Sequence, residues 1–270
     1  MLDSRSRRIR FREPTPIGTL VPQERDKLIF APLRTHGPLT SKHLYKFHGG
    51  DESKFLNRLG KLYDFGYLTR PKEYWECYNA AYQPLVYDLT PKALAFLGKP
   101  GITRTDHAIH RLMCSCVMAS IELACKAKDI GFISREEVTG GGSMRFQLSR
   151  KQNRDFLEPD EVFGLHFKDK QQKHYYAVEI DRGTEKIESD RNRKTIEDMF
   201  SAYEEIFEDR PYEEQWGRKN LHCLVVTTNR ARAETMKKLA GRKIHIQVRE
   251  DFATPWRMPP IYEDVLDGLV

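Results

Sequence analysis

The sequence predicts an α+β / α/β protein with two folded domains, a mainly helical N-terminal one and a C-terminal one built on a mixed sheet. Three observations lead to this prediction. Residues 40–65 have the pattern of two helices joined by a glycine turn, and residues 158–181 that of two strands joined by a charged turn. Residues 190–248 alternate helical and apolar strand patterns. A chain of 270 residues is long enough for two separate cores.

Positive charge is concentrated at the N-terminal end of the chain. Residues 1–100 contain 17 Lys and Arg against 10 Asp and Glu, a balance of +7, whereas the remaining residues balance at −1. Segregated positive charge is typical of a module that binds a polyanion such as DNA. A solvated basic face is the alternative, although it leaves the segregation unexplained.

Residues 1–22 are expected to form a flexible basic arm, because they are rich in arginine and then in proline and have no hydrophobic periodicity. The arm either lies along phosphates or is disordered, and both interpretations stay open. No apolar region follows the arginines, so the arm is not a secretory signal. The sequence has no run of eighteen apolar residues, so it predicts no membrane-spanning helix. The five cysteines form no CxxC pair and fit reduced thiols, so we expect a cytoplasmic protein.

Residues 23–98 predict a helix-turn-helix domain. An apolar stripe begins at Gln23, and Thr40 caps a short helix over Ser41–Phe47. After a glycine turn, Asp51 caps a longer helix that ends near Phe65 and has apolar residues at helical spacing. This pair of helices is the arrangement in which the second helix enters the major groove of DNA.

Two short β runs follow, at residues 67–70 and 85–89, and Pro91 opens another helix. Helix-turn-helix, hairpin and helix together predict a winged helix that binds double-stranded DNA; a protein–protein module is the alternative. The expected DNA contacts are polar side chains of the two helices and the wing: Ser41, Lys42, Lys54, Asn57, Arg58, Lys61 and Arg70.

The hairpin predicted over residues 158–181 brings carboxylates together. Asp160 opens the first strand, and Glu179 and Asp181 close the second, where residues two apart point to the same face. The start of one strand lies beside the end of its antiparallel partner, so all three should form one acidic patch. Hard oxygen ligands suit Mg²⁺ or Mn²⁺, which would relieve the repulsion among them.

Pro159-Asp160 followed by Glu179-x-Asp181 resembles the PD-(D/E)XK nuclease family. The resemblance implies an αβββαβ fold with a mixed sheet, in which the Asp and the Glu hold the metal. In that family a Lys two residues after the Glu helps to activate water. Here that position is Asp181, and acidic residues are known there among active members.

Three further residues are candidates for the same site. In this family a Glu on the first core helix sometimes adds a metal ligand, which implies Glu122; a solvated helix Glu is the alternative. Lys186 and Lys194, close to the next helix, are candidates to supply the ammonium absent at position 181, where it would stabilise a phosphate or orient water. Ordinary exposed lysines are the alternative for both.

Three phrases are similar to the replication-relaxation family: Gly66-Tyr-Leu-Thr-Arg70, Val86-Tyr-Asp-Leu-Thr-Pro-Lys-Ala93 and Val178-Glu-Ile-Asp-Arg-Gly-Thr-Glu185. The resemblance covers roughly residues 24–205. It implies a plasmid- or phage-associated protein with an N-terminal winged helix that acts in plasmid replication and DNA relaxation.

Residues 104–250 are expected to form the nuclease-like domain, and residues 251–270 a tail that wraps or hangs loose. Around the hairpin the predicted elements are a helix over 106–128, a strand over 130–138, a helix from about 190 to 207, strands over 221–228 and 244–248, and a helix over 230–240. The glycines at 140–142 lack a following Lys-Ser/Thr pair, so they are not a phosphate loop. His222 and His245 lack zinc-ligand spacing.

These features predict a DNA-binding protein of plasmid or phage replication that nicks or cleaves DNA with Mg²⁺ or Mn²⁺. No tyrosine lies near a His-x-His cluster, which disfavours a covalent relaxase. The main alternative is a non-catalytic origin-binding or transcription-regulating protein, whose degenerate nuclease-like domain serves dimerisation or DNA geometry. A homodimer is a further possibility, and a partner-docking adaptor would leave the N-terminal charge unexplained.

Overall fold

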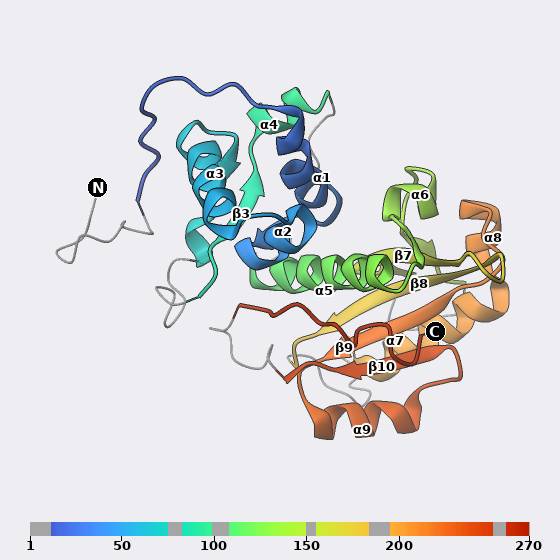
Figure 1. The fold of residues 1–270 in the computed structure, drawn as a ribbon. Helices are drawn as coiled ribbons and strands as arrows, with labels where there is room; N and C mark the ends of the chain where they lie inside the picture. Colours follow the sequence, from blue (N-terminus) through green and yellow to red (C-terminus); the bar gives the residue numbers. More distant parts are fainter. Residues whose placement is uncertain are drawn as a thin grey trace. The chain divides into compact units, whose positions relative to one another are not determined.

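The computed structural model describes residues 12–74, 83–98, 108–149, 155–183, 195–250 and 258–269. The chain divides into two compact units. Unit 1 comprises Met1–Ala119 and Pro255–Ile261, and unit 2 comprises Ser120–Thr254 and Tyr262–Val270. The division falls within the long helix α5 (Ala108–Ala127), which is labelled in Figure 1. Both units mix helices and strands, as the predicted α+β class requires.

Unit 1 is a set of helices around a small antiparallel sheet of order β1-β3-β2. Its elements are η1 (Glu24–Asp26), α1 (Lys27–His36), β1 (Leu39–Thr40), α2 (Ser41–His48), α3 (Glu52–Asp64), β2 (Leu68–Thr69), η2 (Lys72–Tyr74), β3 (Val86–Leu89), α4 (Pro91–Phe96) and the first part of α5.

The predicted helix pair is present and its caps are those expected. Thr40 Oγ1 accepts a hydrogen bond from the His43 N–H, and an Asp51 carboxylate oxygen accepts one from the Lys54 N–H. Each cap satisfies a donor that the first turn of a helix leaves without a partner. The apolar stripe of α3 is narrower than predicted, because Leu56 is 43% exposed.

Unit 2 is built on a five-stranded mixed sheet of order β10-β9-β8-β7-β4. Its elements are the end of α5, β4 (Gly131–Ile133), α6 (Arg135–Thr139), β5 (Phe146–Gln147), β6 (Phe156–Leu157), β7 (Glu161–Phe167), β8 (Gln172–Asp181), α7 (Ile196–Asp209), α8 (Pro211–Trp216), β9 (His222–Thr227), α9 (Arg230–Leu239) and β10 (Ile244–Val248). Strands β4, β7 and β8 pair antiparallel, whereas β8, β9 and β10 pair parallel.

The predicted strand over 130–138 is shorter than expected. Strand β4 ends at Ile133 because Ser134 starts helix α6: its hydroxyl accepts from the Glu137 N–H, and the Glu137 carboxylate accepts from the Ser134 N–H. This reciprocal capping box favours a helix at that point. Helix α7 begins after Thr195, which caps it in the same way together with Asp198.

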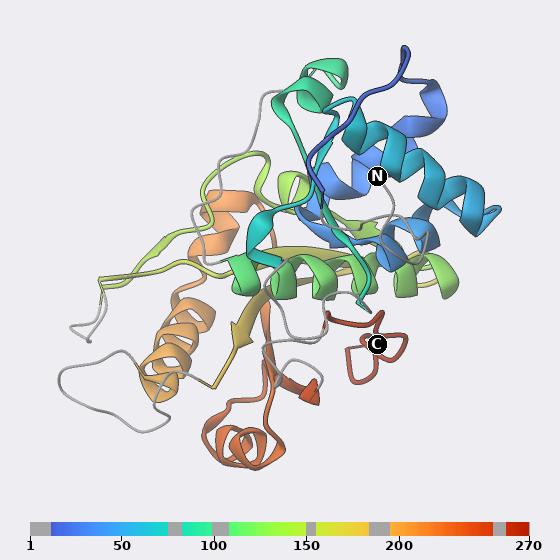
Figure 2. The ribbon, with the colours of Figure 1, turned by 90° about the vertical axis from the view of Figure 1, so that its left-hand side faces the viewer.

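The two faces of the unit 2 sheet pack against different elements. Tyr175, Ala177 and Cys223 belong to the same core cluster as α7 residues such as Tyr203. Figures 1 and 2 show α7 and α9 on this side of the strands. On the opposite face the Tyr176 hydroxyl donates to the Leu269 carbonyl at 2.9 Å.

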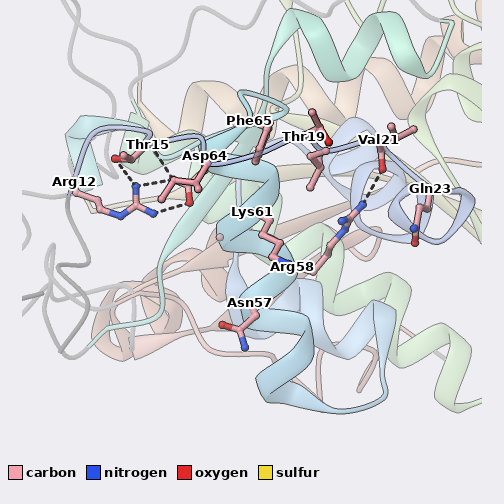
Figure 3. A pocket seen from close by; sticks show the side chains of 13 residues that line it. Arg12, Thr15, Thr19, Val21, Gln23, Asn57, Arg58, Lys61, Asp64 and Phe65 are labelled. Carbon is pink, nitrogen blue, oxygen red and sulfur yellow. Dashed lines mark hydrogen bonds and ion pairs between the residues drawn. The ribbon is translucent and has the colours of Figure 1, made fainter. Parts of the chain in front are cut away.

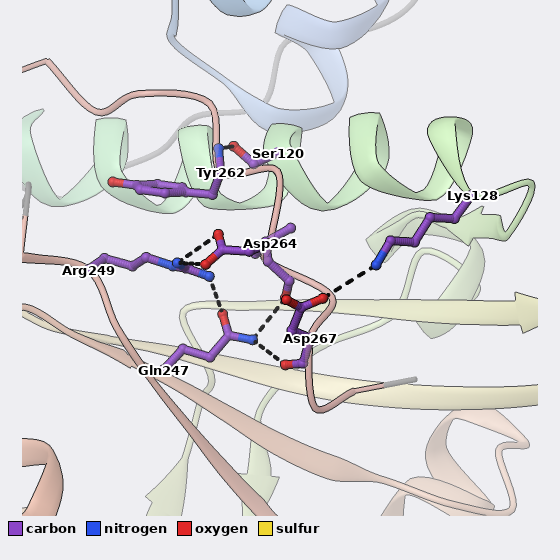
Figure 4. A network of polar contacts seen from close by, with 8 residues as sticks. Ser120, Lys128, Gln247, Arg249, Tyr262, Asp264 and Asp267 are labelled. Carbon is purple, nitrogen blue, oxygen red and sulfur yellow. Dashed lines mark hydrogen bonds and ion pairs between the residues drawn. The ribbon is translucent and has the colours of Figure 1, made fainter.

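The C-terminal residues Tyr262–Leu269 therefore belong to the core of unit 2 rather than hanging loose. The Tyr262 N–H donates to Ser120 Oγ at 3.1 Å, and the Gln247 side chain donates to the Val265 carbonyl at 2.8 Å. Arg249 Nη1 pairs with both carboxylate oxygens of Asp264, at 2.9 Å each (Figure 4). Among the residues with a description, one helix, α5, is long and apolar enough to cross a membrane, but 67% of its apolar window is buried, as in the core helix of a globular protein.

Candidate functional site

The β7–β8 hairpin brings Asp160 to the end of β8, as the sequence pattern predicted. The register pairs Glu161 with Val178 and continues to Phe167 opposite Gln172. Asp160, one residue before β7, extends this pairing with its side chain: a carboxylate oxygen accepts the Ile180 N–H at 2.7 Å. Asp160 is therefore held between the positions of Glu179 and Asp181 on the neighbouring strand.

Glu179 is fixed by a tyrosine of helix α7. The hydroxyl of Tyr203 donates to Glu179 Oε1 at 2.6 Å. Burial raises the pKa of Tyr203 well above its ordinary value, and the negative charges of Glu179 and Asp160 raise it further, so the hydroxyl stays protonated and able to donate. Both charges also raise the pKa of the buried Cys223 thiol, after burial itself.

The charges of Asp160 and Glu179 thus act on the same two buried groups, from strand ends that the hairpin holds side by side. Both carboxylates are half-buried rather than enclosed. Two half-buried carboxylates on neighbouring strand ends offer the hard oxygen donors that Mg²⁺ uses in enzymes, where protein ligands are few and water and phosphate complete the shell.

Asp181 is engaged differently from the other two carboxylates. Arg232 of α9 donates through Nε to Asp181 Oδ2 at 2.6 Å and through Nη2 to Oδ1 at 2.9 Å. The Thr227 hydroxyl adds a bond to Oδ2 at 2.7 Å, and the Gly183 N–H one to Oδ1 at 3.0 Å. Asp181 is 7% exposed. Each of its oxygens accepts two hydrogen bonds. The Asp181 carboxylate is therefore paired with Arg232 of the same chain rather than left for a metal ion.

The remaining predicted members of the site are not placed beside Glu179. Glu122 pairs with Lys126 one turn along α5, at 2.7 Å. Lys186 and Lys194 lie outside the described residues. The cation that the structure places near position 181 is Arg232, which the sequence reading missed.

Neither Tyr203 nor Arg232 had a distinctive sequence signal. Tyr203 lies in the helix predicted from about 190 to 207, and its hydroxyl gains a role from the strand against which the helix packs. Arg232 lies three residues after Asn229, whose side chain caps α9 by accepting the Arg232 N–H at 3.0 Å. In the sequence, the pairing of Arg232 with Asp181 is suggested only by the Asn229 cap that starts α9 near the acidic end of β8.

The predicted DNA contacts of unit 1 are of two kinds. Lys42 and Lys54 are exposed. Ser41 and Arg70 lie inside the unit rather than at the surface where we expected them: Ser41 is 9% exposed and Arg70 8%. The Arg70 guanidinium lies 4.1 Å from the centre of the Tyr63 ring and donates to the Tyr87 hydroxyl at 3.0 Å. This cation–π packing explains why a charged side chain is buried there.

Arg58 is also committed to the protein rather than to the surface. Its Nε donates to Asp26 Oδ1 at 2.8 Å, and its Nη2 pairs with Oδ2. Asp26 is fully buried. Its burial would raise the pKa of the carboxyl, but the hydrogen bonds from Arg58 and from the Gln23 N–H lower it below its ordinary value.

Asn57 and Lys61, the other two predicted contacts, line a cavity of about 840 Å³. The opposite wall is the part of the N-terminal arm that the structure describes, including Thr15, Thr19 and Val21 (Figure 3). The arm is held there by Asp64: Arg12 pairs with it at 2.6 Å and 2.7 Å. Residues 12–22, part of the predicted flexible arm, lie beside α3 in the structure.

Comparison with known proteins identifies one family. A family model described as replication-relaxation matches residues 30–221, well over half of the chain. The matched range contains the α2–α3 pair, the β7–β8 hairpin and Tyr203, and it ends before Arg232. No curated protein and no solved structure gives a match.

Proposed function

The chain belongs to the replication-relaxation family, and from this premise we propose that it binds duplex DNA in plasmid or phage replication and cuts a phosphodiester bond with a divalent metal ion. The family assignment supports a role in replication. The DNA cleavage and the metal are our inference from the site.

The observation that supports the proposal is that the β7–β8 hairpin places Asp160 and Glu179 on neighbouring strand ends. Asp160 is anchored by the Ile180 N–H and Glu179 by the Tyr203 hydroxyl, and both negative charges act on the same buried groups. Like charges held together in a poorly solvated place are unfavourable unless a cation or another partner compensates them. A pair that is fixed in this way suits a metal site.

The donor set fits Mg²⁺ or Mn²⁺, because both prefer carboxylate oxygen and keep several water ligands. Once bound, such an ion would lower the pKa of an attacking water and neutralise phosphate oxygens. Asp160 and Glu179 would hold it. Tyr203 would keep Glu179 in one orientation, as partners of metal ligands commonly do.

Arg232 has a separate role in the proposal. Its guanidinium is fixed beside Asp181, two residues along β8 from Glu179, where the related nucleases carry their lysine. A fixed cation near a scissile phosphate stabilises the charge that develops there. In this account Asp181 positions Arg232 and does not bind the metal.

Unit 1 supports duplex binding through its helix pair and short antiparallel sheet, an arrangement consistent with a winged helix. The exposed Lys42 and Lys54 on α2 and α3 would contact phosphates, and Asn57 and Lys61 would face the groove. Arg58, Ser41 and Arg70 serve the packing of the unit instead.

The proposal is tested with supercoiled plasmid DNA incubated with the protein and Mg²⁺ or Mn²⁺. We expect nicked or linear product that depends on the metal and is absent with Asp160→Asn and with Glu179→Gln. Glu122→Gln is the matched control and should keep full activity. Cleavage that survives both site variants would refute the assignment of the site.

The second candidate is a non-catalytic origin-binding protein. The occupant of position 181 favours it, since Asp181 replaces the expected lysine and is saturated by Arg232, Thr227 and Gly183. Plasmid that stays supercoiled with every divalent metal, while duplex binding persists, would select this function.

A further inference from the structure

The described part of the N-terminal arm is fastened to helix α3 at the end of that helix. Arg12 makes a two-pronged ion pair with Asp64, with Nη1 at 2.6 Å from Oδ1 and Nη2 at 2.7 Å from Oδ2. The Thr15 N–H donates to Asp64 Oδ1 at 3.2 Å, and the Tyr63 hydroxyl donates to the Arg12 carbonyl at 2.6 Å. Four hydrogen bonds therefore join a short stretch of the arm to the last turn of α3.

A second fastening lies one to two turns earlier. Arg58 Nη2 is 3.5 Å from the Val21 carbonyl, and the same guanidinium is fixed by the buried Asp26 just beyond the arm. Between the two fastenings the arm spans the cavity that Asn57, Gly60 and Lys61 line from the helix side. The arm thus forms one wall of this cavity, and Asn57 and Lys61 on the α3 side of it stay exposed (Figure 3).

Residues 12–19 of the arm are held by polar contacts, and Ile17 among them is 85% exposed. Leu20, which follows them, packs against the core cluster of unit 1. The Arg12 and Asp64 side chains keep 20% and 17% of their surface exposed. Such contacts are weakened by salt and by a competing polyanion. Residues 12–19 can therefore leave α3 while Leu20 keeps its place against the core and unit 1 stays folded.

We propose that residues 12–19 are an autoinhibitory strap, which walls the cavity beside Asn57 and Lys61 on α3 and must be displaced before a duplex can approach them. The inference rests on the proposed function, in which α3 enters the groove. Asp64 is the lock, since it holds Arg12 and Thr15 together. DNA phosphates are the competitor, because they attract the same arginine that Asp64 holds.

The strap reverses the ordinary effect of a charge substitution. Arg12→Gln removes one positive charge, which by simple electrostatics weakens DNA binding. If the strap competes with DNA, the same change frees α3 and strengthens binding, by about threefold to tenfold for a lock of this kind. Arg25→Gln removes one charge from the exposed surface of η1 and leaves the strap fastened, so it is the matched control.

The experiment measures hydrogen exchange of the Thr15–Thr19 backbone amides in the full chain, with and without a short mixed-sequence duplex at low salt, and the duplex affinity of each variant by mobility shift. We expect the duplex to accelerate exchange in this segment, Arg12→Gln to bind more tightly than the wild type, and Arg25→Gln not to do so.

Slower exchange on adding duplex, or weaker binding by Arg12→Gln, would overturn the strap, because the arm would then be part of the DNA contact; the proposed duplex binding would survive. Absence of any mobility shift with all three proteins would be a different result, since it removes the proposed function and the strap with it.

Discussion

At the scale of single residues, Tyr203 is the contact that most directly shapes the proposed site. It is fully buried in α7, and its hydroxyl holds Glu179 at 2.6 Å. Because the ring packs in the core while the hydroxyl serves the carboxylate, Tyr203→Phe separates the two contributions.

Tyr203→Phe is expected to lower Mn²⁺ affinity by about tenfold or more, as removal of a partner of a metal ligand typically does. The same change should lower the free energy of unfolding by about 1–2 kcal/mol, since a half-buried carboxylate loses a donor. Titration calorimetry and urea unfolding measure the two effects. Tyr212→Phe, at another fully buried tyrosine of unit 2, should leave Mn²⁺ affinity unchanged; equal losses in both variants would show that packing is responsible.

His43 makes the stability of unit 1 depend on pH. Burial, reinforced by the electrostatic interaction with His36, lowers the pKa of His43 to about 3. The unfolded chain binds a proton at an ordinary pKa near 6.5, so it takes up protons where the folded state does not. The stabilisation is therefore complete above about pH 6.5 and is lost progressively as the pH falls toward 3.

Urea unfolding should show about 2 kcal/mol less stability for unit 1 at about pH 5 than at about pH 7 from this residue. His43→Gln should flatten that dependence even though the variant is less stable overall. A wild-type curve without a slope in this range would contradict the assignment of a buried, uncharged His43.

At the scale of elements, α3 carries both a charge proposed to bind DNA and a charge that stabilises the fold. Lys54 is exposed, whereas Arg58 is the partner of the buried Asp26. Lys54→Ala should weaken duplex binding and reduce the salt slope by about one unit, with unfolding unaffected.

Arg58→Ala should instead lower the free energy of unfolding by about 3 kcal/mol, because Asp26 would stay buried without its cation. Urea unfolding and a salt series of binding isotherms distinguish the two variants. If Arg58→Ala changes only the salt slope, its assignment to the core is wrong.

The elements were predictable from sequence where one local signal dominates. Thr40 and Asp51 cap α2 and α3 as expected, and the alternation on either side of a charged turn predicted the β7–β8 hairpin and the place of Asp160. The strand predicted over 130–138 is too long, because the Ser134–Glu137 capping box starts a helix after Ile133 although β-branched and aromatic residues favour a strand there.

The pairings between distant segments were not predictable in the same way. Asp26 with Arg58, Asp181 with Arg232 and Asp64 with Arg12 join residues 32, 51 and 52 positions apart. Charged residues look alike in sequence whether they are solvated or paired. Which arginines stay exposed depends on the fold. Arg58 is paired with the buried Asp26 and Arg70 is buried, although both were predicted to contact DNA.

At the scale of the whole molecule, the segregated charge and the family assignment point the same way. The positive excess lies in the residues of unit 1, and the carboxylate pair lies in unit 2. The account therefore gives the two units different ligands, a phosphate backbone for one and a small divalent ion for the other. Its central claim is that Asp160 and Glu179 bind that ion together.

The most direct test of that claim is titration of the full-length protein with Mn²⁺, monitored by calorimetry, in the wild type and in Asp160→Asn, Glu179→Gln and Glu122→Gln. The account predicts one site in the wild type that is lost in both Asp160→Asn and Glu179→Gln and is unchanged in Glu122→Gln. Mn²⁺ binding that is equal in the wild type and in both site variants would contradict it.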